Sequence, residues 1–479
     1  MNLRFSTIAL GATIAGLFVS GTAGAYQDCP TGITCTEYKV AAKNGSFFRV
    51  NVPEDWDGDL VIVNHGFDLN RKHIRMHEVC EHNGSITCEN DTDCGPGGQC
   101  NEISYMGLDE ILMPLGKAVA ASTYSETGWA VFDSAKDLKE ILKFVKKEIG
   151  KPTRVIVTGF SLGGAVTGDA TLKMKIDGAV PLCAAVGGGL PTWDVAGDVR
   201  LVYDFLCDDV PGAAFSSPPG VGEPTTSDSD ADALGMALKV NTCFGVLFAS
   251  GDPMEAAAQA SRLADFYSLT QFSGSGIEVA QAMGFATLGM GDFVRDEDRL
   301  KGSPIGFNDT LDYSTMGSDM TLAGEYDAAV ERLEQGKGRK KLTKASFPDF
   351  TKGKGGAVDY PILSMAGAAD WLVIPEFQRV YTTALEDGDK LFTQTWISTY
   401  GHCVFTEEET TALFNEYFAW IDSADFAAAQ PTAQDIEDAC LALPTGIDGD
   451  TCNFDSAFAP DAIFDRIPPR ADWPLAATH

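Results

Sequence analysis

The sequence has few cations, few histidines and no apolar run of membrane-spanning length. Its longest apolar stretch, Ile8 to Val19, falls short of the ~20 residues that such a helix needs, and no second stretch approaches that length. Lys and Arg number 35 against 68 Asp and Glu, which gives a formal charge of -33. A surface so acidic repels nucleic acid and anionic membranes, so neither is expected as a partner.

Patterns for cofactors and metals are weak or missing. Neither a phosphate-cradling loop nor a dinucleotide-binding fingerprint occurs. Two kinds of cluster contain metal-ligating residue types: His73, His77, Cys80 and His82, and the pairs Asp91 with Asp93 and Asp448 with Asp450. The histidines lie beside closely spaced cysteines and are interpreted as surface residues. The aspartate pairs lack the full ligand set of a calcium loop, although a calcium site stays open. We therefore expect no metal and no cofactor.

The N-terminus has the pattern of a secretory signal peptide. Arg4 precedes the apolar run, and Ala23-Gly24-Ala25 stands just ahead of Tyr26. We expect cleavage near Ala25 and a soluble mature protein that is secreted or periplasmic. All twelve cysteines follow this point, and an even number in an oxidising compartment favours disulfides.

The cysteine spacing suggests a disulfide framework without fixing it. Cys29 with Cys35 and Cys440 with Cys452 are natural local pairs. Four others remain for two longer links: Cys183, Cys207, Cys243 and Cys403. The closely spaced Cys80, Cys88, Cys94 and Cys100 indicate a small stapled insert. The connectivity cannot be deduced from the sequence alone.

Short apolar runs recur along the chain and are typical of buried strands. They cover residues 58–66, 118–121, 154–158, 178–185, 360–367 and 392–397. Residues 134–149 carry apolar side chains at helical spacing. Strands that alternate with helices predict an α/β fold, with a mostly parallel central sheet covered by helices on both faces.

The strand-like runs 178–185 and 360–367 are separated by roughly 175 residues, too many for a simple connection. This segment begins with acidic low-complexity sequence and becomes helical around 254–264 and 322–334. We interpret residues 206–355 as a largely helical cap over the site, with an unrelated domain as the alternative. The other expected parts are a signal peptide at 1–25, the first part of the core at 26–205 with a disulfide-rich insert at 80–100, the second part at 356–425, and a C-terminal wrapping tail at 426–479.

The pentapeptide Gly159-Phe160-Ser161-Leu162-Gly163 lies between the strand-like run 154–158 and a helix-compatible stretch. A hydroxyl is well placed to attack when it projects from a tight strand-to-helix turn, and glycines on both sides leave room for that turn. The pattern predicts Ser161 as a catalytic nucleophile. The alternative is a structural turn with an incidental serine.

The partners of such a serine follow in the order acid, then histidine. Only His402 and His479 stand after Ser161, and His402 lies in a Gly-punctuated loop after the run 392–397. We expect His402 to be the base and Asp370, just past the run 360–367, to orient and stabilise its imidazole. The rival acids are Asp359 and Glu376.

An oxyanion that forms during attack needs two backbone N–H donors. One is expected from Leu162, directly after the nucleophile, and the second from Phe67 in the turn after the run 58–66. His65 is expected to be structural. Tyr124 and Trp129 are candidate substrate-binding residues, with aromatic packing as the alternative.

Four landmarks carry a family resemblance: His65-Gly66, the pentapeptide followed by Gly164, Gly367-Ala368-Ala369-Asp370, and Gly401-His402. In order and spacing they resemble the α/β-hydrolase superfamily over about residues 40–205 and 355–425. Within it the chain is similar to secreted serine esterases and prolyl-oligopeptidase-like hydrolases. His402-Cys403 also resembles tannases and feruloyl esterases, where a Cys beside the His is linked to one preceding the Ser. Here Phe160 precedes Ser161, so the candidate partners of Cys403 are Cys183, Cys207 and Cys243.

These observations predict an exported serine hydrolase that cleaves carboxylic esters through an acyl-enzyme intermediate. Its substrate is expected to be a small or polymeric ester, with aromatic esters and polyesters included. Two alternatives stay open: a prolyl-oligopeptidase-like serine peptidase, and a non-catalytic secreted binding protein on a hydrolase scaffold.

Overall fold

The structure is a computed structural model, and the described residues form two compact units. It describes residues 29–67, 79–80, 83–87, 100–101, 105–126, 128–225, 229–295, 300–340, 359–386, 391–444 and 452–460. The expected signal peptide at 1–25 lies outside these residues, as do most of the expected disulfide-rich insert and the end of the tail. No helix in the described ranges is both long enough and apolar enough to span a bilayer.

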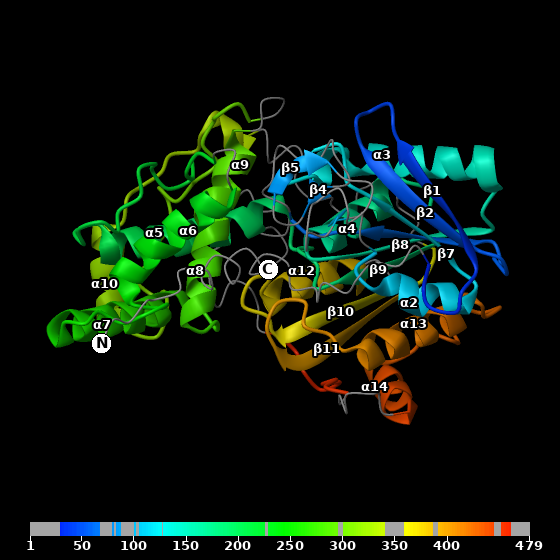
Figure 1. The fold of residues 1–479 in the computed structure, drawn as a ribbon. Helices are drawn as coiled ribbons and strands as arrows, with labels where there is room; N and C mark the ends of the chain where they lie inside the picture. The colour runs from blue at the N-terminus through cyan, green and yellow to red at the C-terminus, as the bar shows by residue number, and fades with distance from the viewer. Residues whose placement is uncertain are drawn as a thin grey trace, which may run out of the picture. The chain divides into compact units, whose positions relative to one another are not determined.

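Eight strands form the central sheet of the larger unit, Gly21–Val186 and Pro348–Pro460 (Figure 1). In spatial order they are β1 (Cys35–Ala41), β2 (Phe47–Pro53), β7 (Ala118–Ser122), β3 (Asp59–Asn64), β8 (Arg154–Phe160), β9 (Gly178–Leu182), β10 (Ile362–Ala369) and β11 (Phe392–Tyr400). In this sheet β2 pairs antiparallel with β1 and β7, and the other pairs of neighbours are parallel. This topology is the α/β-hydrolase fold, as predicted.

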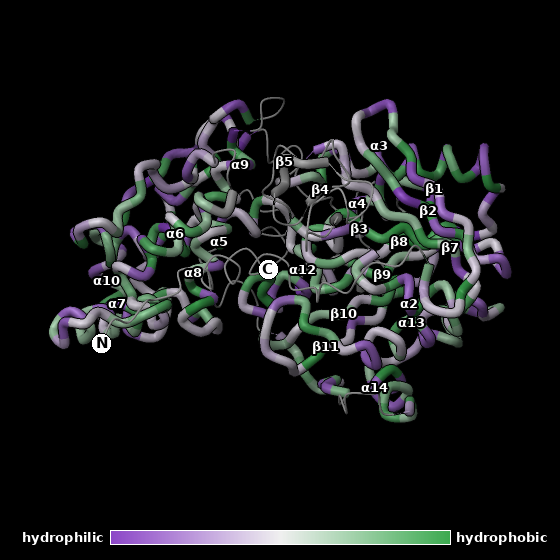
Figure 2. The backbone as a smooth tube through the Cα atoms, viewed as in Figure 1, coloured by the Kyte–Doolittle hydropathy of each residue, from purple (hydrophilic) through white to green (hydrophobic). Residues whose placement is uncertain are grey.

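The central strands are largely apolar because both faces are covered. Every residue of β3 is buried, and so are the five of β9. Figure 2 shows the hydrophobic character running along β8. The sequence runs 58–66, 118–121, 154–158, 178–185, 360–367 and 392–397 are thus confirmed as strands. The first and fourth are shorter than predicted, the second, third and sixth are longer, and the fifth is shifted by two residues.

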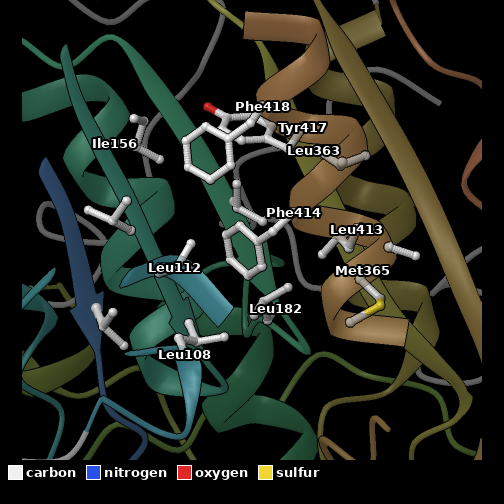
Figure 3. Close-up of a cluster of buried hydrophobic side chains, with 14 of the residues drawn as sticks. Leu108, Leu112, Ile156, Leu182, Leu363, Met365, Leu413, Phe414, Tyr417 and Phe418 are labelled. Carbon is white, nitrogen blue, oxygen red and sulfur yellow. The ribbon is translucent and has the colours of Figure 1, made fainter. Parts of the chain in front are cut away.

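Helices cover both faces of the sheet (Figure 1). In this unit they are α2 (Leu108–Leu112), the 3-10 turn η2 (Met113–Leu115), α3 (Val131–Phe144), the π-helical η3 (Val145–Ile149), α4 (Leu162–Lys173), α12 (Pro375–Glu386), α13 (Glu407–Ile421) and α14 (Ala433–Ala442). On one face α2 and α13 pack on the strands, and Figure 3 shows their side chains, such as Leu112 and Phe414, meeting Ile156 and Leu182. The helices α3 and α4 pack on each other, with α4 against β8 and β9.

The strand register brings the carboxyl ends of neighbouring strands to one edge. Asn64 at the end of β3 pairs with Gly159 near the end of β8, and Phe160 pairs with Leu182 at the end of β9. Cys183 N–H then donates to the Met365 carbonyl in β10 at 2.8 Å. Loops that follow these strands therefore leave the sheet side by side.

The second unit, Gly187–Phe347, is helical in its described part. Its helices are α5 (Gly189–Cys207), α6 (Ser229–Phe244), α7 (Pro253–Thr270), α8 (Gly276–Gly284), the π-helical η4 (Phe285–Gly289), α9 (Met290–Val294) and α10 (Met320–Ala329). Trp193 of α5 stacks on Phe285 and Phe293, and the Cys207–Cys243 disulfide joins α5 to α6.

The start of this unit differs from the sequence-based boundary at residue 206. Residues 187–205 belong to the helical unit because α5 packs on α7, α8 and η4. A buried ion pair within the unit, Arg339 with Asp194, has N–O distances of 2.6 and 2.9 Å and fixes α5 further. The assignment of 206–355 as a cap over the site stays a prediction.

The disulfide-rich insert is described only in part. Three short strands, β4 (Val79–Cys80), β5 (Asn83–Thr87) and β6 (Cys100–Asn101), form a separate antiparallel sheet in the order β5-β4-β6. The histidines at 73, 77 and 82 and the aspartates at 91, 93, 448 and 450 lie outside the described residues. In the parts of the chain that are described, no group of three or more potential metal ligands comes together.

Candidate active site

Ser161 occupies a strained turn between β8 and α4. Its φ of 57° and ψ of -116° are unusual for a residue with a side chain, which fits the sharp turn that the pentapeptide predicts. The Ser161 N–H donates to Leu182 O at 3.0 Å, and its carbonyl accepts from Ala185 N at 3.2 Å. The turn is thus fastened to the end of β9.

The two glycines of the pentapeptide are required by backbone contacts. A Cβ at Gly163 would lie 2.0 Å from the Asn64 carbonyl oxygen, and one at Gly159 would lie 2.6 Å from the same atom. Such distances exclude any side chain without a shift of the backbone. The turn after β3 is therefore pressed directly against the turn that holds Ser161.

The structure brings Ser161, His402 and Asp370 together in a hydrogen-bonded series. His402 Nε2 lies 2.8 Å from Ser161 Oγ, and His402 Nδ1 lies 2.7 Å from Asp370 Oδ2. An ionised carboxylate only accepts, so Nδ1 carries the proton and Nε2 is free to accept the serine proton. Such a series can raise the nucleophilicity of the serine oxygen. The rivals Asp359 and Glu376 do not occupy this position.

Both oxygens of Asp370 are engaged. Oδ1 accepts from the N–H groups of Leu372 and Val373, each at 2.9 Å, while Oδ2 faces the imidazole. Only 1 % of the carboxylate side chain is exposed, against 11 % of the His402 side chain. The carboxylate is therefore held in one orientation by its own loop before any substrate binds.

His402 is held by a short loop between β11 and α13. Gly401 has a φ of 124°, and Thr406 and Glu409 form a capping box that starts α13. The next residue, Cys403, is linked to Cys183 just after β9, and its sulfur lies 3.4 Å from His402 Nε2. The sequence left three candidate partners for Cys403, and the structure selects Cys183.

The expected oxyanion donors lie beside Ser161. Leu162 begins α4, so its N–H belongs to the first turn, where the groups have no partner within the helix. On the other side, a Cβ at Gly66 would lie 3.7 Å from the Ser161 Cβ, which places the 65–67 turn next to the nucleophile. This turn directly precedes the end of the first described segment, at Phe67.

The two candidate substrate-binding residues are both buried. Tyr124 is 1 % exposed and Trp129 is 5 % exposed. The Tyr124 hydroxyl donates to the His65 carbonyl at 3.0 Å, and its ring packs on the His65 imidazole with 4.3 Å between centroids. Tyr124 therefore contacts the turn that carries Phe67, a relationship that the sequence did not predict.

One surface depression of the described structure does not contain this series. It measures about 500 Å³ and is lined by Lys139, Leu142, Lys143, Lys146, Lys147, Met174 and Lys175. These residues come from α3, η3 and the segment after α4, away from Ser161 at the other end of α4. The candidate site is therefore defined by its hydrogen bonds and not by this depression.

Comparison with known proteins gives distant structural similarity only. No family model matches the chain, and no curated protein matches it. An esterase of Pyrococcus furiosus is 11 % identical, with 81 % of this chain and 90 % of that chain covered at a TM-score of 0.36. An acylaminoacyl peptidase of Pyrococcus horikoshii is 8 % identical, with 83 % and 44 % covered at a TM-score of 0.39. Feruloyl esterase B of Aspergillus oryzae is 13 % identical, with 84 % and 85 % covered at a TM-score of 0.36.

Proposed function

We propose that the chain is a serine hydrolase that cleaves carboxylic esters. The observation that carries this proposal is the series of two hydrogen bonds, 2.8 Å from Ser161 Oγ to His402 Nε2 and 2.7 Å from His402 Nδ1 to Asp370 Oδ2. Serine, imidazole and carboxylate in this order are the parts that acyl transfer requires. Their positions at the carboxyl ends of β8, β11 and β10 suit an α/β-hydrolase site.

In the first half of the reaction His402 takes the Ser161 proton as the oxygen attacks the ester carbonyl. The carbonyl oxygen becomes an oxyanion, which the Leu162 and Phe67 N–H groups stabilise. The C–O bond to the alcohol then breaks, and His402 gives its proton to the departing alcohol. An acyl group remains on Ser161.

In the second half water replaces the alcohol. His402 removes a proton from water, the hydroxide adds to the acyl carbonyl, and the bond to Ser161 Oγ breaks as His402 returns the proton. Throughout, Asp370 holds the imidazole in the tautomer that can accept from serine and stabilises its charged form. Each atom is supplied by substrate, water or these side chains, so the reaction needs no cofactor.

Export is proposed with this function. Four disulfides in the described part, Cys29–Cys35, Cys183–Cys403, Cys207–Cys243 and Cys440–Cys452, are suited to an oxidising compartment. They match the local pairs and the two longer links that the cysteine spacing suggested. The signal peptide pattern at 1–25 supports the same proposal.

The proposal is tested with p-nitrophenyl esters of increasing acyl length and the purified mature protein. Ser161→Ala and His402→Ala are expected to lower kcat about 10⁴-fold or more, since each removes a member of the series. Ser134→Ala is the matched control, because the hydroxyl of this buried serine of the same unit donates to Val131 O at 3.1 Å, outside the series. The profile of rate against acyl length then measures the acyl pocket.

Other outcomes separate the alternatives. Faster turnover of peptide p-nitroanilides than of any ester would show that the enzyme is a serine peptidase and not an esterase. Absence of turnover, together with no labelling of Ser161 by a fluorophosphonate, would refute hydrolysis and favour a non-catalytic binding protein.

A further inference from the structure

A hydrogen bond from a side chain to the backbone fixes the turn that presents Phe67. His65 Nδ1 lies 2.8 Å from the Gly66 carbonyl oxygen. A carbonyl can only accept, so Nδ1 donates the proton of this bond. The Gly66 carbonyl and the Phe67 N–H belong to one planar trans peptide and point in opposite directions. The hydrogen bond from His65 therefore sets the direction of the Phe67 N–H.

Tyr124 in turn holds His65. Its ring packs on the imidazole, with 4.3 Å between centroids and an interplanar angle of 31°, and its hydroxyl donates to the His65 carbonyl at 3.0 Å. Burial, with a smaller contribution from Asp137, raises the pKa of the Tyr124 hydroxyl well above its ordinary value. The phenol therefore stays protonated and keeps donating over the working pH range of a protein.

Tyr124 is itself locked in an unfavourable backbone conformation. Its φ is 56°, a region that residues with side chains seldom occupy. Its N–H donates to Ser122 Oγ at 3.0 Å, and the Ser125 N–H and Oγ donate to Asp137 Oδ2 at 2.8 and 3.1 Å. Strain of this kind persists only where the surroundings over-determine the conformation, and it concentrates at functional sites.

The same turn is bounded on its other side by the nucleophile. A Cβ at Gly163 would lie 2.7 Å from the His65 carbonyl oxygen, and one at Gly66 would lie 3.7 Å from the Ser161 Cβ. The 64–66 backbone thus lies between the Ser161 turn and the Tyr124 ring. A change in the contact between Tyr124 and His65 therefore acts on a backbone segment that also contacts the Ser161 turn.

We propose that His65 and Tyr124 are positioning residues for the oxyanion: Tyr124 holds the imidazole, and the imidazole aims the Phe67 N–H through the Gly66 carbonyl. This inference rests on the proposed hydrolase function and replaces the expected substrate-binding role of Tyr124. Neither side chain touches substrate. Because a donor stabilises an oxyanion only when it is aimed correctly, these contacts affect the transition state and not ground-state binding.

The experiment compares four variants with the wild-type mature protein. Tyr124→Phe removes the hydroxyl and keeps the ring, and His65→Leu removes the Nδ1 donor. His65→Asn is the conservative variant, because its amide N–H₂ can take the place of Nδ1–H. Tyr417→Phe is the matched control, since this buried tyrosine of the same unit also donates to a backbone carbonyl, that of Pro361, at 3.3 Å.

The readouts are kcat, KM, Tm, and the rate of Ser161 labelling by a fluorophosphonate, whose phosphoryl oxygen uses the same donors. We expect kcat and labelling rate to fall roughly 10-fold in Tyr124→Phe and roughly 100-fold in His65→Leu, with KM changed less than about twofold. His65→Asn should recover most of the loss. Tyr417→Phe should lower Tm and leave kcat unchanged.

Two results overturn the inference: losses in Tyr124→Phe and His65→Leu no larger than in Tyr417→Phe, or losses that appear in KM and not in kcat. A wild type that is labelled but cleaves no ester refutes the ester proposal alone, because the labelling rates still measure the positioning effect. A wild type that is neither labelled nor active overturns both.

Discussion

At the scale of single residues, the site depends on which atoms accept hydrogen bonds and from which donors. Asp370 uses Oδ1 for two backbone N–H groups and Oδ2 for His402 Nδ1–H. The two oxygens therefore have separate tasks, one that holds the loop and one that fixes the histidine tautomer. Substitutions of Asp370 can separate the tasks.

Asp370→Asn is expected to lower kcat about 10⁴-fold with little change in Tm. Its carbonyl oxygen can keep the bonds from Leu372 and Val373, but its N–H₂ faces Nδ1 and favours the tautomer in which Nε2 is protonated. Asp370→Ala is expected to lose similar activity and also to lower Tm, since two buried N–H groups lose their acceptor. Steady-state kinetics and thermal melts measure both. An Asn variant with near wild-type kcat would contradict the tautomer argument.

At the scale of elements, loops after β9, β10 and β11 supply the groups that surround Ser161. The Cys183–Cys403 disulfide joins the first and last of these loops beside His402. Both cysteines have a positive φ, 39° for Cys183 and 57° for Cys403. This backbone conformation is rare for residues that carry a side chain. We infer that this link restrains the His402 loop as well as the fold.

Cys183→Ser with Cys403→Ser is expected to lower both stability and kcat. The stability loss is expected to be about 2–4 kcal/mol, as for a typical structural disulfide, and kcat should fall because His402 samples more orientations. Cys440→Ser with Cys452→Ser is the matched control, since it opens a disulfide in the tail and should affect stability alone. Urea unfolding and kinetics below the transition measure the two effects. Unchanged kcat in the first double variant would show that the link is purely structural.

At the scale of the whole molecule, burial is the commonest cause of the carboxylate pKa shifts. Burial is the main cause of a raised pKa in seven described carboxylates: Asp109, Glu110, Asp137, Asp169, Asp204, Asp265 and Glu416. The pKa of Asp137 and that of Asp204 are each raised to about 6. Hydrogen bonds lower the pKa of Asp312, Asp327 and Asp435.

Stability is expected to increase as the pH falls from 7 to about 5. Because the pKa of Asp137 is raised in the folded state, the folded state binds this proton more tightly than the unfolded state does. The resulting stabilisation is complete below the ordinary pKa of 3.8 and is lost as the pH rises through about 6. Asp137 alone contributes on the order of 2–3 kcal/mol. Relief of repulsion at a net charge of -33 acts in the same direction.

Calorimetry between pH 4.5 and 8 checks this prediction. Tm should rise by roughly a few °C on acidification, and Asp137→Asn should make the profile of Tm against pH shallower between about pH 4.5 and 6. The two proteins are compared by the slope of Tm against pH and not by the absolute Tm. Asp137→Asn also changes the bonds to Ser125 and Asn44, which shifts Tm at every pH. A wild-type Tm that falls or stays level from pH 7 to 5 would contradict the argument.

Much of the core was predictable because its signals are local. Strand runs, the glycines around Ser161 and the position of His402 in a short loop depend on residues close in sequence. The strands β1 and β2, at one end of the sheet order, were not predicted, because polar residues interrupt their pattern. Arg49 and Asn51 of β2 are buried, and their polar groups are paired with Glu37 and with the Tyr105 hydroxyl. Such pairing is visible only after distant segments have come together.

The order of the proposed catalytic residue types along the chain follows from local sequence: a serine in a strand-to-helix turn, then an acid, then a histidine. Three other features became visible in the folded chain: Cys403 joins Cys183, α5 belongs to the helical unit, and Tyr124 contacts His65. The physical reason is the range of the interactions. Backbone geometry and apolar periodicity are set by neighbours, whereas disulfides, ring packing and buried hydrogen bonds need groups that only the folded sheet places within contact distance.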